Sequence, residues 1–467
     1  MAKAPTAKTI FIEDLTEGQL NKALTLPAGL KNLGNTCYMN ATLQCLKTVP
    51  VLRDALGSYN GDVLSSTASG VFNSAPAITA ALRDLYRTMD HSTQSEVVPL
   101  IMLQILHMAF PRFAEKGEHG EPMQQDANEC WSEVVRMLQQ ELKSTAVSKT
   151  VSEPNANITE AGSSAGASAA PPHSSIISQY FGGQFEVTMK CKESPEEEET
   201  KTAEDFVQLS CFMPTEVKYM HSGLRARLNE EITKHSPTLN RDAIYERKSL
   251  LTRLPAYLTI QFVRFYYKEK GATNAKILKD VKFPISLDVY DLCSSELQKK
   301  LTPMRNKFKE ADDKAVASGR VNKQIAAMLR EADTKPKNYH PFSFQDDIGS
   351  NNSGYYELQA VLTHKGRSSN SGHYVAWVRR SPESRDWVMC DDENVSVIGE
   401  EDILRLSGGG DWHCAYVLMY GPRRLEIDDG GTNETGDAVN KCEATNNVAS
   451  SQNGAVGETM DTGGDGQ

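Results

Sequence analysis

The chain has 467 residues, of which 39% are hydrophobic, and carries a formal net charge of −11 at pH 7. This length allows about two or three domains, or one large domain with insertions. The acidic balance argues against a nucleic-acid binder or a protein of anionic membranes, and the longest apolar run, residues 101–110, is too short to span a bilayer. Nine irregularly spaced cysteines, in a chain whose first residues do not resemble a signal peptide, predict reduced thiols in the cytoplasm, and also in the nucleus.

The order of the predicted elements indicates an α+β fold. Residues 1–25 are predicted to be an extension ahead of the folded part. From 26 to 142 the apolar spacing predicts amphipathic helices, over 78–89, 98–110 and 126–142. From 180 onward strand patterns dominate, over 184–190, 257–266, 355–363, 374–378 and 415–420. Helices followed by a strand-rich half predict two packed layers with a cleft between them.

Composition changes mark segments outside this predicted core. Residues 144–175 are rich in Ser, Ala, Thr and Asn, which predicts a flexible insertion. Residues 294–337 are crowded with charges and contain pieces compatible with a helix, so a mobile or a helical insertion fits. The tail, 425–467, has almost nothing to bury and is predicted to be disordered. The acidic run 196–199 is predicted to be a solvated loop between strands.

Cys37 is a candidate nucleophile because of the loop and the helix on either side of it. It follows an amide-rich loop, and the apolar spacing of residues 39–47 predicts a helix. With Asn35 or Thr36 as the N-cap, the thiol lies at the positive end of the helix dipole, which favours the thiolate. Asn32 is a candidate oxyanion donor beside the backbone N–H of the cysteine. On these residues alone, a small buried cysteine without a chemical role is the alternative.

His373 is the candidate base for this thiol. It opens a predicted strand after a loop of glycines and serines, residues 366–372, and the next strand ends at Asp391 and Asp392. With the hairpin turn centred on Pro382, His373 and Asp391 are equally far from the turn and face each other across the pair. Asp392 then points to the opposite face, and a slip of one residue exchanges the two aspartates.

Three segments of the chain carry the short motifs that can be compared with known families. They are GLKNLGNTCYMN at 29–40, QQDANE at 124–129, and GHYV at 372–375 with the strands 387–391 and 415–420. Together they resemble the cysteine, Gln-Gln-Asp and histidine boxes of the ubiquitin-specific protease family, and they extend from residue 26 to about residue 424. Longer stretches resemble the proteasome-associated members of this family, among them 101–117, 254–284, 342–353 and 403–424.

The resemblance implies a papain-like catalytic domain over residues 26–424, with thumb, palm and fingers subdomains. It also implies a thiol-dependent deubiquitinase that hydrolyses the (iso)peptide bond after the C-terminal glycine of ubiquitin. At the matching positions, Cys37 is the nucleophile, His373 the general base, Asp391 the residue that orients the base and Asn32 the oxyanion donor. The implied partners are ubiquitin, ubiquitinated proteins and the regulatory particle of the 26S proteasome.

The same resemblance assigns residues to the channel for the ubiquitin tail. Gln125 and Asp126 match positions that line it, although a helix N-cap is a second role for Asp126. Two surface loops that lie over this channel in the subfamily match residues 266–275 and 366–372. Glycines and serines in both loops predict mobility; the positions singled out are Tyr266, Gly271, Gly366, Ser369 and Gly372.

Two departures from the family pattern lead to further expectations. Many members bind zinc at the tip of the fingers through two Cys-x-x-Cys pairs, whereas Cys191 and Cys211 stand alone here, so we expect no metal and no cofactor. The proteasome-associated members begin with a ubiquitin-like domain. Residues 1–25 are too few to form such a fold, so the sequence predicts a chain without that domain.

Alternatives remain for both the base and the function. His413 is the competing base, but no carboxylate stands at a comparable hairpin spacing, so a mainly structural role is expected. A non-catalytic scaffold that binds ubiquitin or the proteasome is one alternative function, and the intact set of candidate residues argues against it. A general papain-like peptidase is a second alternative, which the wide separation of Cys37 from His373 disfavours.

Overall fold

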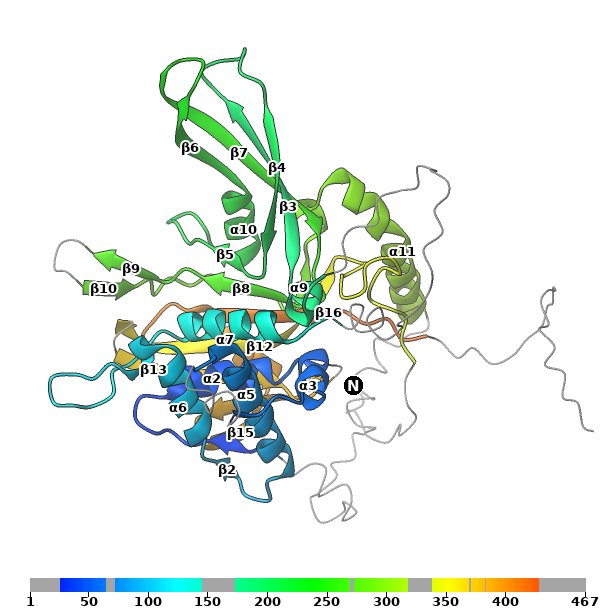
Figure 1. The fold of residues 1–467 in the computed structure, drawn as a ribbon. Coiled ribbons are helices and arrows are strands. Elements are labelled where there is room, and N and C mark those ends of the chain that lie inside the picture. The colour runs from blue at the N-terminus through cyan, green and yellow to red at the C-terminus, as the bar shows by residue number, and fades with distance from the viewer. Residues whose placement is uncertain are drawn as a thin grey trace, which may run out of the picture. The chain divides into compact units, whose positions relative to one another are not determined.

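The computed structural model describes residues 26–63, 72–144, 173–268, 273–317, 338–368, 371–382 and 384–427. The predicted extension 1–25, most of the predicted insertion 144–175 and most of the predicted tail 425–467 lie outside these ranges. The described residues up to Glu426 belong to one structural unit. In this unit we use the name thumb for the mainly helical part before residue 145. The largest sheet is called the palm, and the four-stranded sheet that projects from it is called the fingers (Figure 1).

The thumb is helical because apolar side chains recur along each segment at helical spacing. In α7 (Ala127–Glu141) the buried face includes Cys130, Val134 and Leu138, and Asp126 caps the helix by accepting hydrogen bonds from two backbone N–H groups of the first turn. The helices expected over 78–89, 98–110 and 126–142 are confirmed. The other thumb elements are β1 (Gly29–Leu30), α2 (Cys37–Leu46), α3 (Pro50–Gly57), α5 (Ser74–His91), β2 (Glu96–Val97), α6 (Leu100–Ala109) and the 3-10 helix η2 (Pro111–Ala114).

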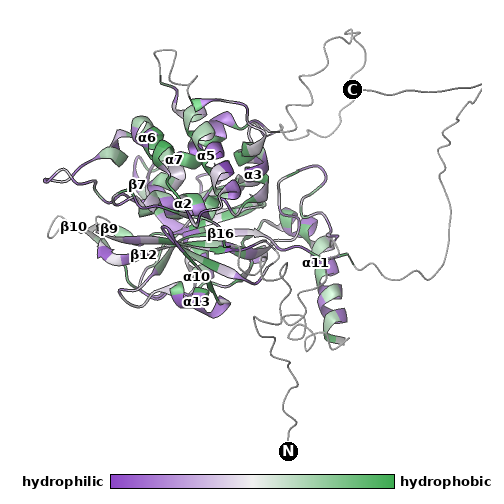
Figure 2. Ribbon diagram, turned by 90° about the horizontal axis from the view of Figure 1, so that it is seen from below, coloured by the Kyte–Doolittle hydropathy of each residue, from purple (hydrophilic) through white to green (hydrophobic). Residues whose placement is uncertain are grey.

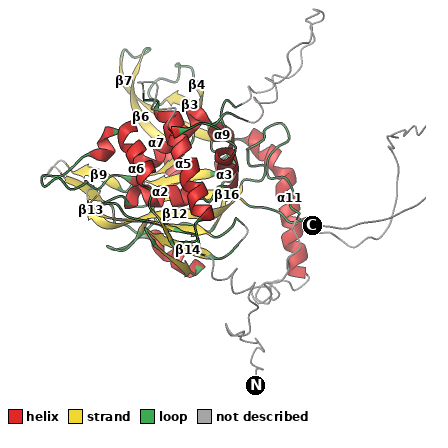
Figure 3. Ribbon diagram, turned by 60° about the horizontal axis from the view of Figure 1, so that its bottom comes forward, coloured by secondary structure: helices red, strands yellow, loops and turns green. Residues whose placement is uncertain are grey.

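The palm is an eight-stranded sheet in the order β15-β14-β13-β12-β16-β8-β5, with β11 attached to β12. Its strands are β5 (Leu209–Cys211), β8 (Leu258–Phe262), β11 (Ser286–Asp288), β12 (Tyr355–Ser368), β13 (Ser371–Arg379), β14 (Trp387–Asp391), β15 (Asn394–Ile398) and β16 (Cys414–Pro422). Both faces are covered: the thumb helices lie on one (Figures 2 and 3), and α10 (Met220–Leu228) and α13 (Glu400–Leu404) lie on the other (Figure 2). Strand alternation explains the two cores, since Leu362 packs with the thumb and its neighbour Val361 packs on the far face.

The fingers form a four-stranded sheet in the order β4-β3-β7-β6. Its strands are β3 (Gly183–Cys191), β4 (Thr200–Phe206), β6 (Asn229–Ser236) and β7 (Arg241–Arg253). The acidic run 196–199 lies in the turn between β3 and β4, as predicted. One of its members is not simply solvated, because the Glu197 carboxylate accepts a hydrogen bond from Ser236 Oγ at 2.6 Å.

The strand expected over 257–266 is wrong as one continuous element. It divides into β8 in the palm and β9 (Phe265–Lys268), which pairs instead with β10 (Thr273–Lys276). The cause is Arg264, which lies between the two strands and is fully buried. Its guanidinium donates to the backbone carbonyls of Ala415, Ile277, Lys279 and Ser407 at 2.6–3.0 Å. These side-chain bonds anchor the chain at the point where it leaves the palm sheet.

The segment 294–337 is not a flexible insertion throughout. Residues Ser295–Ala317 form α11, and residues 318–337 lie outside the described residues. The buried side chains of α11 recur every three or four residues and fix the helix on the palm side; they are Leu297, Leu301, Met304 and Phe308. Neither α11 nor any other helix in the described ranges is long and apolar enough to cross a membrane. The remaining short elements are α9 (Ile176–Tyr180), η3 (Tyr290–Leu292) and η4 (Arg405–Ser407).

Candidate active site

Cys37 is the first residue of α2 and is only 1% exposed. Thr36 is the N-cap residue, but its hydroxyl does not cap the helix; it accepts a hydrogen bond from the backbone N–H of Leu33 at 2.9 Å. The first-turn N–H groups of α2 therefore have no side-chain cap, and the thiol lies at the positive end of the helix dipole. This is the setting expected from the sequence.

The Asn32 side chain is held from both ends of its amide. Its Oδ1 accepts hydrogen bonds from the backbone N–H groups of Gly34 and Thr36 at 3.0 and 3.2 Å. Its Nδ2 donates to Asp392 Oδ2 at 2.8 Å. An amide nitrogen carries two hydrogens, so within the described residues the second one stays available to an oxyanion. Asn32 lies on the loop that leads into Cys37, and its role as the oxyanion donor stays a prediction.

His373 and Asp391 are joined by a hydrogen bond of 2.5 Å between Nε2 and Oδ1. The hydrogen bond with Asp391 and the nearby Cys37 thiol raise the pKa of His373 to about 10. The imidazole in turn lowers the pKa of Asp391. Because Nε2 is occupied by the carboxylate, Nδ1 is the ring nitrogen left for the thiol. The structure therefore brings the candidate nucleophile, base and orienting carboxylate together in one cluster.

The strand register of this hairpin differs from the one predicted. Ala376 pairs with Cys390, so the position opposite Asp391 is Val375, two residues from His373 along β13. The centre of the observed pairing lies one residue beyond Pro382, the predicted centre of the turn. Because the displacement along the strand is even, His373 and Asp391 stay on one face and meet as diagonal neighbours.

Asp392 is the residue whose role sequence reasoning missed. It has a φ of 52° and turns its carboxylate toward the thumb, where Oδ1 accepts from Asn40 Nδ2 at 2.9 Å and Oδ2 accepts from Asn32. Burial raises the pKa of Asp392, and the hydrogen bonds from Asn40 and Asn32 oppose that rise. Asn40 also donates to the Leu30 carbonyl at 3.1 Å, so it ties the nucleophile helix to the loop of the oxyanion donor. The adjacency of two aspartates was the only sequence signal for this network.

The Gln-Gln-Asp segment supplies three residues with different surroundings. Asp126 caps α7 and accepts hydrogen bonds on both carboxylate oxygens from the Tyr416 hydroxyl, at 2.9 and 2.8 Å. Burial raises the pKa of Asp126, although these hydrogen bonds lower it in part. Gln125 is half-buried beside it. Gln124, which the sequence did not single out, is buried and its Nε2 lies 3.4 Å from Cys37 Sγ.

The two predicted gating loops are largely hairpin strands. Tyr266 lies in β9, paired with β10, and its side chain is 48% exposed. Gly366 lies near the end of β12 and Gly372 is the second residue of β13, with φ values of 125° and 128°. A Cβ atom on Gly372 would lie 2.1 Å from the Lys365 carbonyl oxygen, so glycine permits the close approach of the two strands. Gly271 and Ser369 lie outside the described residues, and movement on ubiquitin binding stays a prediction.

His413, the competing base, lies in the palm interior rather than beside the thiol. Its Nδ1 is 3.2 Å from Thr363 Oγ1, which also accepts a hydrogen bond from Trp377 Nε1 at 2.8 Å. Burial lowers the pKa of His413 to about 4, so the ring is neutral near pH 7. These contacts support the structural role expected for it.

The described residues contain one group of His, Cys, Asp and Glu side chains close enough to share a metal ion, namely His373, Asp391 and Asp392. Its donor atoms are already engaged, because Asp391 holds the imidazole and Asp392 holds two amides. In the fingers and palm, Cys191 and Cys211 are buried free thiols on β3 and β5. The absence of zinc stays a prediction.

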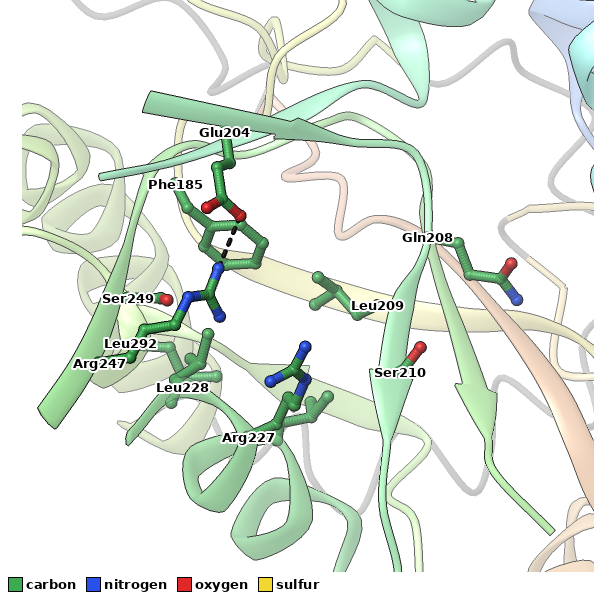
Figure 4. A pocket seen from close by; sticks show the side chains of 11 residues that line it. Phe185, Glu204, Gln208, Leu209, Ser210, Arg227, Leu228, Arg247, Ser249 and Leu292 are labelled. Atoms are coloured by element: carbon green, nitrogen blue, oxygen red, sulfur yellow. Dashed lines mark hydrogen bonds and ion pairs between the residues drawn. The ribbon is translucent and has the colours of Figure 1, made fainter. Parts of the chain in front are cut away.

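A separate hollow of about 150 Å³ lies where the fingers meet the palm (Figure 4). Arg227 and Arg247 form part of its wall, and Arg247 pairs with Glu204 at 2.6 Å. Most of its apolar lining belongs to the core on the palm face away from the thumb; these residues are Leu209, Leu224, Leu228 and Leu292. The hollow is therefore not the cleft of the candidate active site.

A family profile described as "Ubiquitin carboxyl-terminal hydrolase" matches residues 28–420. The chain belongs to this family. Ubiquitin carboxyl-terminal hydrolase 6 of Arabidopsis thaliana is 39% identical over 441 residues, which cover 91% of this chain and 84% of the relative. Ubiquitin carboxyl-terminal hydrolase 14 of Caenorhabditis elegans is 40% identical over 411 residues, which cover 86% and 74%. This ubiquitin carboxyl-terminal hydrolase is a cysteine deubiquitinase.

A solved structure shows the same fold at low sequence identity. It is the SAGA Ubp8/Sgf11/Sus1/Sgf73 DUB module bound to ubiquitin aldehyde, which matches with a TM-score of 0.52 at 20% identity and covers 86% of this chain and 72% of that chain. The predicted α+β, papain-like architecture of the ubiquitin-specific proteases is confirmed.

Proposed function

We propose that this deubiquitinase removes ubiquitin from substrates bound to the proteasome, in the cytoplasm and also in the nucleus, with Cys37, His373, Asp391 and Asn32 as its catalytic residues. The observation that supports these roles is the hydrogen bond between Asp391 and His373, whose pKa is also raised by a nearby thiol at a helix N-terminus. The proposed association with the proteasome rests on the resemblance of the longer sequence stretches to proteasome-associated members of the family.

The geometry supports the following sequence of steps. The Cys37 thiolate attacks the carbonyl carbon after the last glycine of ubiquitin, and Asn32 Nδ2 with the Cys37 N–H stabilises the oxyanion. His373, which is protonated at neutral pH, gives its proton to the departing lysine amine. Water, deprotonated by the now neutral His373, then attacks the thioester carbonyl and expels the Cys37 thiolate, which releases the ubiquitin carboxylate and restores the thiolate beside a protonated His373. Gln125 and Asp126 are proposed to contact the ubiquitin tail.

A ubiquitin probe with a C-terminal electrophile tests the catalytic part of this proposal. We expect wild-type protein to form a covalent adduct one ubiquitin heavier, and Cys37→Ala to form none. The control is Cys293→Ala, which removes a buried thiol from the far core and should label like the wild type. If the wild type forms no adduct, the chain acts as the non-catalytic scaffold. Labelling that survives in Cys37→Ala would assign the nucleophile to another cysteine.

The proposed association with the proteasome is tested separately, with purified 26S particles. We expect the chain to cosediment with them and to shorten ubiquitin chains on a bound substrate. Equal activity on free and proteasome-bound conjugates, without cosedimentation, would leave a general deubiquitinase and remove the proteasome from the proposal.

A further inference from the structure

Gln124 touches the candidate nucleophile directly. Its Nε2 lies 3.4 Å from Cys37 Sγ and its Oε1 lies 3.8 Å from the same sulfur. The glutamine side chain is 9% exposed and the cysteine 1%, so bulk water does not replace this contact. The contact joins the Gln-Gln-Asp segment to the cysteine loop, which lies 87 residues earlier in the chain.

The backbone on either side of Gln124 is fixed by hydrogen bonds. On the N-terminal side, Asn35 Nδ2 donates to the Pro122 carbonyl at 2.8 Å and fastens this segment to the cysteine loop. On the C-terminal side, Asp126 caps α7 and accepts a hydrogen bond from the Tyr416 hydroxyl. A short segment anchored at both ends leaves the amide little freedom to move away from the sulfur.

We infer that Gln124 is a positioning residue for the nucleophile: its Nε2–H donates to the Cys37 thiolate and holds Sγ beside His373. This inference rests on the proposed function and deepens it, because it names how the sulfur is aimed at the base. A hydrogen bond to a charged acceptor is stronger than one to a neutral acceptor, so the amide stabilises the thiolate more than the thiol. Loss of the amide shifts the thiol–thiolate balance toward the thiol.

The other titratable groups around the sulfur do not duplicate this effect. From β13, His373 and Tyr374 face it, and Tyr38 does so from α2 itself. Burial raises the pKa of both tyrosines, which therefore stay neutral across the pH range of activity. Asp391 acts on the sulfur through His373. Among the described groups named here, Gln124 is thus a neutral donor to the sulfur, whereas His373 is the cationic one.

The test measures the rate at which iodoacetamide alkylates Cys37 from pH 5 to pH 10, read by peptide mass spectrometry. For Gln124→Leu we expect a rate about three- to tenfold lower at pH 7 and a rise displaced to higher pH, with the same plateau in alkali. Gln124→Glu keeps the side-chain shape and places a carboxylate beside the sulfur. Its alkylation rate should therefore rise at a still higher pH than that of Gln124→Leu. Gln140→Leu, on the exposed face of α7, is the matched control.

Profiles of both Gln124 variants that superimpose on the wild type would overturn the inference. A uniform loss of rate at every pH would also overturn it, because that is the result of altered access or folding. Alkylation by a small reagent needs no ubiquitin, so this experiment is decided independently of the ubiquitin probe. The probe tests whether the chain is active, and the alkylation profile tests what Gln124 does to the thiol.

Discussion

The two sides of the active-site cleft are built in different ways. On the thumb side, Cys37 and Asn40 are almost fully buried, and hydrogen bonds to backbone and side-chain groups tie their loops together. On the palm side, the His373 and Asp391 side chains are 34% and 38% exposed, and they depend mainly on each other. The thumb thus presents a preorganised nucleophile, whereas the palm presents a base whose position follows that of a hairpin. Substitutions on the two sides should therefore fail in different ways.

The largest effects should come from the two adjacent aspartates, which serve opposite sides of the cleft. Asp391→Ala removes the partner of His373 and should lower kcat/KM by about 10²-fold or more, by analogy with orienting acids in other triads. The pKa of His373 should then fall, and the alkaline limb of the pH–rate profile should move to lower pH. Asp392→Ala releases Asn32 and should lower kcat/KM by about 10-fold, less than the roughly 10²–10³-fold loss for removal of an oxyanion donor, because the amide itself remains.

Steady-state hydrolysis of a fluorogenic ubiquitin substrate measures both variants, and Asp386→Ala in the exposed β13–β14 connection is the matched control. A larger loss of kcat/KM in Asp392→Ala than in Asp391→Ala would reverse the expected order of the two aspartates. Asp392 Oδ2 lies 3.9 Å from His373 Nε2, so that result would transfer the orienting role to it.

A smaller effect is expected from the hairpin that carries the base. Gly372→Ala places a Cβ atom 2.1 Å from the Lys365 carbonyl oxygen at a φ of 128°, so the strand must shift beside His373. We expect kcat/KM to fall several-fold, with the melting temperature lowered by a few degrees at most. Gly57→Ala, where a Cβ would meet nothing within 4 Å, is the control. Unchanged kinetics for Gly372→Ala would show that the palm side is as rigidly held as the thumb side.

Sequence patterns predicted the parts of this site that depend on local structure. The helix dipole at Cys37 and the shared face of His373 and Asp391 follow from spacing within one helix or one hairpin. The observed register of this hairpin differs from the predicted one because Pro382, although a typical turn residue, does not lie at the centre of the strand pairing. The contacts between Asp392 and Asn40, 352 residues apart, arise only when the thumb packs on the palm. Such contacts carry no local signal, and the same is true of Gln124.

The smallest effect concerns the palm interior, whose buried histidine should make it sensitive to acid. The folded pKa of His413 is about 4, below its ordinary value, so between pH 4 and 6.5 the unfolded chain binds the extra proton. The free energy of unfolding should therefore fall as the pH falls through this range, by about 1–2 kcal/mol at pH 5 for this residue. Urea unfolding of His413→Gln should depend less steeply on pH than that of the wild type, while His91→Gln, at the exposed end of α5, should not differ from it. Equal slopes for His413→Gln and wild type would assign the acid sensitivity to other groups, such as His364 in β12, whose pKa burial lowers to about 3.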